Sequence, residues 1–270
     1  MRKRGSSHAL GVAIVAVACL LAPAHPRAQF EKMLSTTYDG WTRLPDGSFE
    51  LVFGYMNRNS TEVDVPLGPA NLVEPAPQDH GQPTHFLPGR QRDAFRIAVP
   101  AGFKGKFVWT MTYAGATQVA TGSLDQNYSL DVGDPEPPTV KAGRDLSVRI
   151  ADGASLAPIV GAAPAPPAPP ANSEVVARRS SGGRISVWWS KFRGPGDVTF
   201  GQGERTTSTA PGPTGREVPM GTFRLVCTNP PDAACGATTA RFSVPGTYWL
   251  RVVVAERSAS NSMVKVVVAP

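Results

Sequence analysis

Apolar side chains recur at every second position in several stretches of this chain, and this spacing constrains its fold more than any other feature. In Lys104–Tyr113 they fall at Phe107, Trp109, Met111 and Tyr113. Successive side chains of a β-strand point to opposite faces of a sheet, so a period of two residues is typical of half-buried strands. No stretch shows a convincing 3.6-residue period of an amphipathic helix. The sequence therefore predicts an all-β protein.

Turn residues separate these stretches along most of the chain. Leu44–Gly47 has the Pro-Asp-Gly chemistry of a tight turn, and Ala114-Gly115 separates two strands as in a hairpin. Many short strands between Gly and Pro turns are typical of β-sandwiches. The other expected strands are Ser48–Met56, Asp93–Val99, Ala116–Thr121, Asp145–Ile150, Ser155–Val160, Arg184–Ser190, Asp197–Phe200, Thr222–Val226, Thr238–Ser243, Gly246–Glu256 and Ser262–Ala269.

The fold expected from these patterns is two Ig-like β-sandwich domains after an N-terminal signal peptide. The boundary between them is an acidic, Pro-rich break, and a second Pro-rich run is read as a loop inside the second domain. The alternative, in which this run is a semi-rigid linker between domains, remains open. The predicted parts are a first domain at 30–132 with a long loop at 57–92, a linker at 133–138, and a second domain at 139–270 with a Pro-rich loop at 161–172 and an insertion at 202–236.

The first residues have the composition of a secretory signal peptide. Three basic residues at positions 2–4 precede an apolar run over Ala9–Ala22. Small residues after this run form a cleavage site, so the signal peptide is expected to span residues 1–24, with cleavage after Ala28 as the alternative. The apolar run is shorter than the roughly 20 residues of a membrane span. We therefore expect an exported protein of the periplasm, the cell surface or the extracellular space. A lipoprotein acylated at Cys19 is a second interpretation.

The charge of the chain changes when this leader is removed. The formal net charge of +6 includes the three basic residues at positions 2–4, so the excess of basic over acidic residues falls to three. No run of Lys and Arg remains that would follow a phosphate backbone. We expect no nucleic-acid partner and no transmembrane segment after signal cleavage.

Two cysteines, Cys227 and Cys235, follow the leader in the sequence. In an oxidising compartment, two cysteines this close in sequence usually pair, and Pro230 and Pro231 between them favour a chain reversal. We expect a disulfide that pins a local hairpin. Two free thiols are the alternative.

A long polar excursion, Gly54–Arg92, separates two of the expected strands. Connections longer than about 12–15 residues without regular structure are uncommon in compact domains and are often functional. This excursion contains enough apolar residues to fold back onto a sheet, so we expect it to be ordered. These residues are Tyr55, Val65, Leu67, Phe86 and Leu87.

Two segments of the second half carry a family resemblance. Val187–Phe200 (VWWSKFRGPGDVTF) and Ala240–Arg251 (ARFSVPGTYWLR) resemble the W-S-K-x-x-G-P-G-x-V-x-F and F-S-x-P-G-x-Y-x-L-R segments of PKD-like and related Ig-like repeats in secreted bacterial proteins. The resemblance implies an Ig-like sandwich in which Trp189 is the buried strand tryptophan and Tyr248 lies at the corner before the penultimate strand. Such modules are usually spacers or binding units.

The chain departs from these repeats in two places. The Asp-Asp-Gly turn between early strands is replaced by the Pro-rich run, and the insertion Gln202–Ala234 is unusually long. The N-terminal half looks like uncharacterised exported bacterial proteins with the same two-part layout.

Candidate recognition groups lie where the expected strand Ser48–Met56 ends and the excursion begins. Tyr55, Asn57, Arg58 and Asn59 combine an aromatic face with amides that suit a sugar or a peptide backbone. Gln82, further along the excursion, is a further candidate. The alternative is that Asn57 and Asn59 only cap a turn and satisfy backbone groups.

A second cluster contains two histidines. Asp79, His80 and His85 lie within seven positions, and Glu74 precedes them, so a metal could use both imidazoles with a carboxylate. The spacing lacks the repeated pair of specific metal motifs, so these residues are weak candidates and the expected site is without metal. No motif for a nucleophilic serine, a phosphate loop or a dinucleotide is present, and we expect no enzyme and no cofactor.

Two tryptophans are expected to point away from the core. The alternation places Trp188 and Trp249 on the faces opposite Trp189 and Tyr248. They are expected either at a domain or partner contact, or beneath the insertion that follows Gln202.

These observations favour a non-catalytic exported protein of the cell envelope that mediates protein–protein binding or surface assembly. Its partner is then another envelope or extracellular protein. The second interpretation is a carbohydrate-binding accessory module with a solvent-facing aromatic residue beside Asn57 and Asn59, bound to polysaccharide. A third is a metal-dependent hydrolase that uses His80 and His85.

Overall fold

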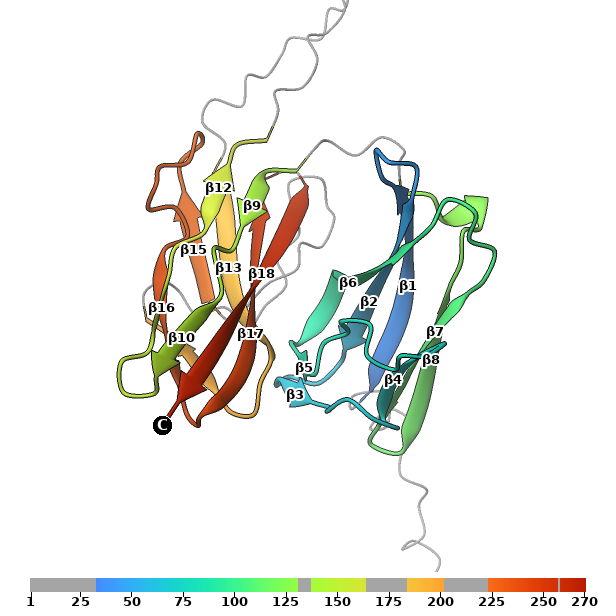
Figure 1. The fold of residues 1–270 in the computed structure, drawn as a ribbon, viewed down its shortest axis with the longest axis horizontal. Helices are drawn as coiled ribbons and strands as arrows, with labels where there is room; N and C mark the ends of the chain where they lie inside the picture. The colour runs from blue at the N-terminus through green and yellow to red at the C-terminus, as the bar shows by residue number, and fades with distance from the viewer. Residues whose placement is uncertain (1–32, 131–136, 164–183, 202–222, 257) are drawn as a thin grey trace, which may run out of the picture.

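The computed structural model describes residues 33–130, 137–163, 184–201, 223–256 and 258–270 (Figure 1). The predicted signal peptide, the linker apart from its last two residues, most of the Pro-rich loop and the first 21 residues of the insertion lie outside them. Within the described residues the chain is all-β, as predicted, with a single short 3-10 turn, η1 (Gln126–Tyr128). No described helix has the length and apolar character that a membrane crossing needs.

The first group of sheets is built from eight strands. In one sheet β2 lies between β1 and β6, in another β7 lies between β4 and β8, and β3 pairs with β5. All of these pairs are antiparallel. The strands are β1 (Leu34–Arg43), β2 (Phe49–Asn57), β3 (Val63–Asp64), β4 (Asn71–Glu74), β5 (His85–Phe86), β6 (Gly89–Val99), β7 (Phe107–Tyr113) and β8 (Ala116–Gly122).

The second group contains ten strands. Its largest sheet has the order β10-β18-β17-β13-β15, in which only β10 and β18 run parallel, and the smaller sheets are β11-β16-β14 and β12-β9. The strands are β9 (Thr139–Lys141), β10 (Leu146–Arg149), β11 (Ala154–Leu156), β12 (Ile159–Gly161), β13 (Ile185–Arg193), β14 (Val198–Phe200), β15 (Phe223–Cys227), β16 (Thr238–Phe242), β17 (Gly246–Ala255) and β18 (Ala259–Ala269).

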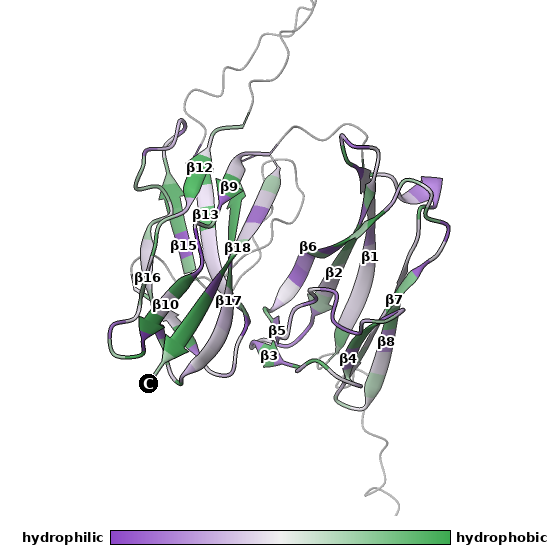
Figure 2. Cartoon of the chain, viewed as in Figure 1, coloured by the Kyte–Doolittle hydropathy of each residue, from purple (hydrophilic) through white to green (hydrophobic). Residues whose placement is uncertain are grey.

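Each group encloses its own hydrophobic core. Trp109 lies at the centre of the N-terminal core, with the rings of Phe53 and Phe95 edge-on to it at centroid distances of 6.4 and 4.9 Å. The C-terminal core contains Trp189 and Tyr248, both fully buried. Apolar stretches run along β18 and β15 of the second group in Figure 2, whereas β6 is hydrophilic along part of its length.

The predicted turns are present. In Leu44–Gly47 the amide of Gly47 donates to the carbonyl of Leu44 at 3.0 Å. Ala114 and Gly115 both have positive φ, 49° and 81°, which is the backbone twist that a two-residue hairpin needs. Tyr113 and Ala116 are therefore direct partners in the β7–β8 pair.

The single strand predicted over Ser155–Val160 is wrong, because the chain forms two strands there. β11 ends at Leu156 and pairs with β16, whereas β12 begins at Ile159 and pairs with β9. Pro158 lies between them, and its missing N–H and fixed φ interrupt a continuous ladder. The chain changes sheets at this point.

The disulfide between Cys227 and Cys235 is present, with a Cα–Cα distance of 5.6 Å. It does not pin a hairpin, which corrects that part of the prediction. Cys227 ends β15, which pairs with β13, whereas β16 after Cys235 pairs with β11 and β14. The bond therefore secures the passage of the chain from one sheet to another.

The excursion Gly54–Arg92 is ordered, as expected, and it contains β3, β4 and β5. Four of its five predicted apolar anchors are buried, and Leu67 is the exposed exception. Fully buried Asn71, which no sequence pattern marks, holds the excursion in place. Its amide group donates to the carbonyls of Val65 and Pro83, and its side-chain oxygen accepts the indole N–H of Trp109 at 2.9 Å.

Replacing Cys227 and Cys235 together with Ser is expected to lower the free energy of unfolding by about 2–3 kcal/mol, because the short ring restricts the unfolded chain. Guanidinium chloride denaturation of both proteins measures the difference. Reduced wild type is the control and should match the variant. Equal stability of the oxidised wild type and the variant would contradict the prediction.

Candidate functional site

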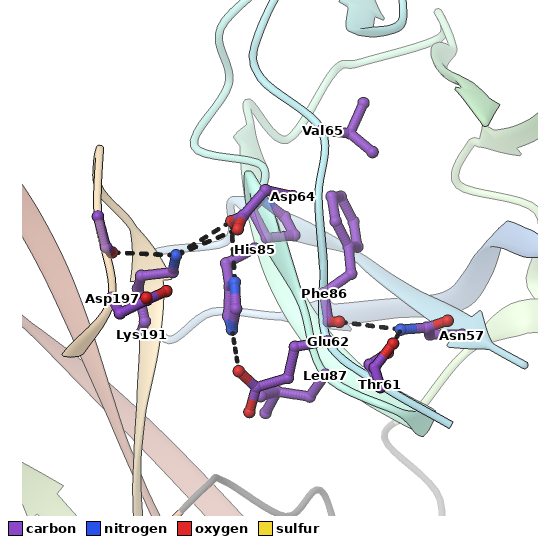
Figure 3. A network of polar contacts seen from close by, with 12 residues as sticks. Asn57, Thr61, Glu62, Asp64, Val65, His85, Phe86, Leu87, Lys191 and Asp197 are labelled. Atoms are coloured by element: carbon purple, nitrogen blue, oxygen red, sulfur yellow. Dashed lines mark hydrogen bonds and ion pairs between the residues drawn. The ribbon is translucent and has the colours of Figure 1, made fainter. Parts of the chain in front are cut away.

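Charged side chains gather where the excursion and β6 of the first group meet β13 and β17 of the second. The contributing residues of β13 are consecutive: Lys191, Phe192 and Arg193. We call the contacts made by these three residues and by Arg251 of β17 the interface. It joins segments more than 100 residues apart in the sequence, and Figure 3 shows its part around Lys191.

Phe192 belongs to a strand of the second group but packs into the N-terminal core. Its side chain is only 5% exposed. The pairing of β13 with β17 shifts register between Lys191 and Arg193, which marks a β-bulge. A bulge bends the strand and re-aims its side chains, and here both Lys191 and Phe192 are buried. The carbonyl of Phe192 also accepts a hydrogen bond from the amide of Thr84 at 3.2 Å.

Arg193 holds the tip of the excursion. Its guanidinium makes two hydrogen bonds to the carboxylate of Asp79, at 2.7 and 3.0 Å, and its Nε donates to the carbonyl of Gln82 at 2.7 Å. This two-point contact fixes direction as well as distance. The guanidinium lowers the pKa of Asp79 below its ordinary value, and burial only partly opposes the shift.

Lys191 is 6% exposed and needs a partner, because a buried unpaired charge is strongly destabilising. Its Nζ lies 3.2 Å from Oδ1 of Asp64 in β3 and donates to the carbonyl of Gly196 at 3.2 Å. Asp64 thus connects the excursion directly to β13. The carboxylate of Asp64 is itself about half exposed, so water reaches one side of the pair.

His85 completes this array (Figure 3). Its Nδ1 lies 2.9 Å from Oδ1 of Asp64, and its Nε2 lies 3.2 Å from Oε2 of Glu62. Burial opposes the charged imidazolium, but the contacts with the two carboxylates outweigh it and raise the pKa of His85. Burial likewise opposes ionisation of Asp64, yet its contacts with His85 and Lys191 lower the pKa of Asp64.

A second part of the interface lies at β6. Arg251 of β17 is buried and donates to the backbone carbonyl of Asp93. Asn261 of β18 donates to the carboxylate of Asp93 at 3.1 Å. Met263, also on β18, packs against the N-terminal core. Three basic side chains of the second group of sheets therefore contact aspartate residues of the first group.

The predicted recognition groups at the end of β2 are mostly engaged inside the protein. The Tyr55 ring is buried and its hydroxyl accepts the amide of Leu87 at 2.9 Å. Asn57 is also buried, and its side-chain oxygen accepts the amide of Asn59 at 2.9 Å, which is the turn-capping role. Arg58 is exposed. The solvent-facing aromatic that the carbohydrate interpretation expected here is therefore in the interior.

Gln82 is fully buried and braces the excursion. Its side-chain oxygen accepts the amide of His80 at 2.8 Å, and its amide group donates to the carbonyl of Gln78 at 2.8 Å. Its own carbonyl is the acceptor for Arg193. These bonds present the carbonyl of Gln82 to the second group of sheets.

The two histidines have separate partners. Nε2 of His80 lies 2.8 Å from the carbonyl of Pro75, and its ring is edge-on to Phe107. His85 lies between Asp64 and Glu62. Among the residues that the structure describes, no group of three or more His, Cys, Asp or Glu side chains is arranged to hold a metal ion.

The two tryptophans differ. Trp188 is only 4% exposed, and the guanidinium of Arg224 lies 5.8 Å from its ring centroid. Arg224 is the direct β15 partner of Trp188 in the same sheet, and the first 21 residues of the insertion lie outside the described residues, so the placement of Trp188 beneath the insertion stays a prediction. Trp249 is 37% exposed, as expected for an outward residue.

No motif in the sequence marks Lys191, Glu62 or Asp64 as a site. The interface draws them from distant parts of the chain, and no local spacing links them. One signal was available: Phe192 is a large apolar residue on the face opposite Trp189, between two cations. An apolar side chain on that face implies a covering partner.

Comparison with known proteins adds no family to these observations. A scan against protein-family models finds no match for the chain, and a search of curated proteins finds no similar sequence.

Replacing Phe192 with Ala is expected to destabilise the N-terminal group by about 3–5 kcal/mol, because a buried ring is removed from its core. Denaturant unfolding measures the loss, and small-angle X-ray scattering should show a larger radius of gyration as the two groups separate. Phe200→Ala, which alters packing on the C-terminal core, is the control. It should lower stability without expanding the protein. A Phe192→Ala variant with the stability and radius of gyration of the wild type would contradict the role given to Phe192.

The lowered pKa values of Asp64 and Asp79 predict an acid-labile interface. Each ionised carboxylate stabilises the folded state above the ordinary pKa of 3.8, and this contribution is lost as pH falls through the lower folded value. In denaturant titrations from pH 6 to 2, the free energy of unfolding should fall less with acid in an Asp64→Asn/Asp79→Asn variant than in wild type. Asp152→Asn, which breaks an ion pair outside the interface, should keep the wild-type profile. Identical profiles in all three proteins would disprove the assignment.

Proposed function

We propose that this chain is an exported, non-catalytic protein of the cell envelope that binds a partner protein through the outer face of β17 and β18 around Trp249. The exposure of Trp249 is the observation that carries the proposal. Tryptophan is a residue type enriched at protein interfaces, because its large ring gives much contact area and its N–H remains available for a hydrogen bond.

The strand register supplies neighbours for Trp249. Lys265 of β18 is its direct partner, and Val267, two residues further along, lies on the same face and is also exposed. On the other side Arg193 is the β13 partner of Trp249, and Asp79 holds its guanidinium. We call Trp249, Lys265 and Val267 the Trp249 surface. An apolar centre with a charged border is the usual composition of a binding patch.

We also infer that both groups of sheets are Ig-like sandwiches and that the second is PKD-like. The hydroxyl of Tyr248 donates to the carbonyl of Val244 at 2.8 Å, as in a tyrosine corner. A Cβ on Gly194 would lie 2.2 Å from the Tyr248 ring, which explains a glycine in the G-P-G segment. The buried indole of Trp189 donates to the carbonyl of Gly236 at 2.8 Å.

Export is supported by two independent features. The N-terminal sequence has the composition of a signal peptide. The disulfide between Cys227 and Cys235 suits an oxidising compartment such as the periplasm or the extracellular space.

The second candidate function is a carbohydrate-binding module. The Trp249 ring lies beside polar groups, Lys265 and the Arg193–Asp79 pair, and a flat aromatic face with polar neighbours suits stacking on a sugar. In this interpretation the sugar stacks on Trp249 and not on Tyr55, the aromatic residue that the sequence suggested.

Trp249→Ala is expected to lower capture of the envelope partner by at least about tenfold, because the central ring of a binding patch usually carries more than 1.4 kcal/mol. The immobilised protein is incubated with solubilised envelope protein and, separately, with envelope polysaccharide. Retention on polysaccharide that needs Trp249 would select the carbohydrate function instead.

Tyr128→Ala is the matched control, because Tyr128 is an exposed aromatic residue on η1 of the first group. It should bind like wild type. Both variants should fold, as checked by circular dichroism. Equal capture by wild type and Trp249→Ala would refute the Trp249 surface.

A further inference from the structure

The exposed turn between β2 and β3 is held at its two ends by different chemistry. Asn57 holds the start: its amide group donates to the carbonyls of Thr61, at 3.2 Å, and Phe86, at 2.9 Å. At the other end the carboxylate of Glu62 contacts Nε2 of His85 at 3.2 Å. The amide of Asn57 does not titrate, whereas the imidazole of His85 does.

The surroundings of His85 come from several elements (Figure 3). Asp64 of β3 meets its Nδ1, and Glu62 from the preceding turn meets its Nε2. Lys191 of β13 shares Asp64 with it. Asp197, which follows the Gly196 carbonyl that accepts from Lys191, lies beyond Lys191 in this view.

One further titratable group acts on the Glu62 side. The Tyr55 hydroxyl of β2 is within electrostatic range of Glu62 and also of Arg251 of β17. Both ring nitrogens of His85 face carboxylates. The protonated ring therefore has a negative partner on each side.

We propose that the Glu62–His85 ion pair is a pH-sensitive clasp: it closes the Arg58–Glu62 turn against β5 when His85 is protonated and releases the turn when His85 is neutral. The clasp controls how firmly Arg58 and Asn59 are presented at the surface. It does not depend on whether a partner binds at the Trp249 surface.

The geometry explains why the release is confined to Glu62. A neutral imidazole keeps one N–H, and the Asp64 contact at Nδ1 is the shorter of the two, so the proton stays on that side. Nε2 then points a lone pair at the carboxylate of Glu62, and two acceptors repel each other. The Glu62 side chain is already 37% exposed and turns into water. The Asp64–Lys191 pair persists, so the interface stays closed.

The direction of the pH dependence follows from the raised pKa of His85. Because the contacts with Asp64 and Glu62 outweigh burial, the folded protein holds the proton to a higher pH than the ordinary value of 6.5. The clasp is complete below that ordinary value. It opens as pH rises through the raised pKa of His85.

Hydrogen exchange of the purified protein, followed by mass spectrometry from pH 5.5 to 9, tests the clasp. After correction for intrinsic exchange rates, protection of the amides at 58–62 is expected to fall about three- to tenfold as His85 loses its proton. In Glu62→Gln the protection should stay flat, because an amide can both donate to a neutral ring and accept from a charged one. The NMR titration of His85 should also move to lower pH in that variant.

Glu74→Gln is the matched control, since it makes the same chemical change at an exposed position of the same excursion. It should follow wild type in both measurements. The proposal is overturned by constant protection of residues 58–62 in wild type while His85 titrates. It is equally overturned if Glu62→Gln keeps the wild-type pH dependence.

Discussion

Phe192 joins the two groups of sheets by completing a core to which its own strand does not belong. Burial of such a side chain contributes about 1.5–3 kcal/mol, whereas a half-exposed ion pair contributes about 0–1 kcal/mol. The ring therefore supplies most of the attraction, and the charges on either side of it determine the orientation. Asp64 and Asp79 are both about half exposed, which places their pairs with Lys191 and Arg193 in this weaker class.

Orientation matters because the same strand supports the proposed binding surface. Arg193 is held by Asp79 on one side and is the β13 partner of Trp249 on the other. The interface thus fixes the edge of the Trp249 surface, so the proposed partner would meet a preorganised patch. The proposed clasp at His85 lies on the same excursion but acts on the exposed turn, so the turn can respond to pH while the two groups stay joined.

The regular elements were predicted well, because strand periodicity and turn chemistry are local. The hairpin at Ala114-Gly115 and the pairing of Cys227 with Cys235 are confirmed. The errors arose where the chain changes sheets. Ser155–Val160 reads as one apolar run, yet Pro158 divides it between two sheets. The disulfide likewise lies where the chain passes from β15 to β16 in another sheet, because the partner of a strand is decided by the whole topology.

The sequence by itself determined the all-β class, most strand positions and the disulfide, and it indicated that the excursion is ordered. Each of these properties depends on neighbours within a few residues. Only the tertiary structure decided what the polar residues do. Asn57 and Gln82, which the sequence offered as candidates for recognition, make internal hydrogen bonds. Lys191 and Asp64, which are 127 residues apart, form an ion pair. Such a pair has no local signature, because its two members are brought together by the packing of Phe192 rather than by spacing along the chain.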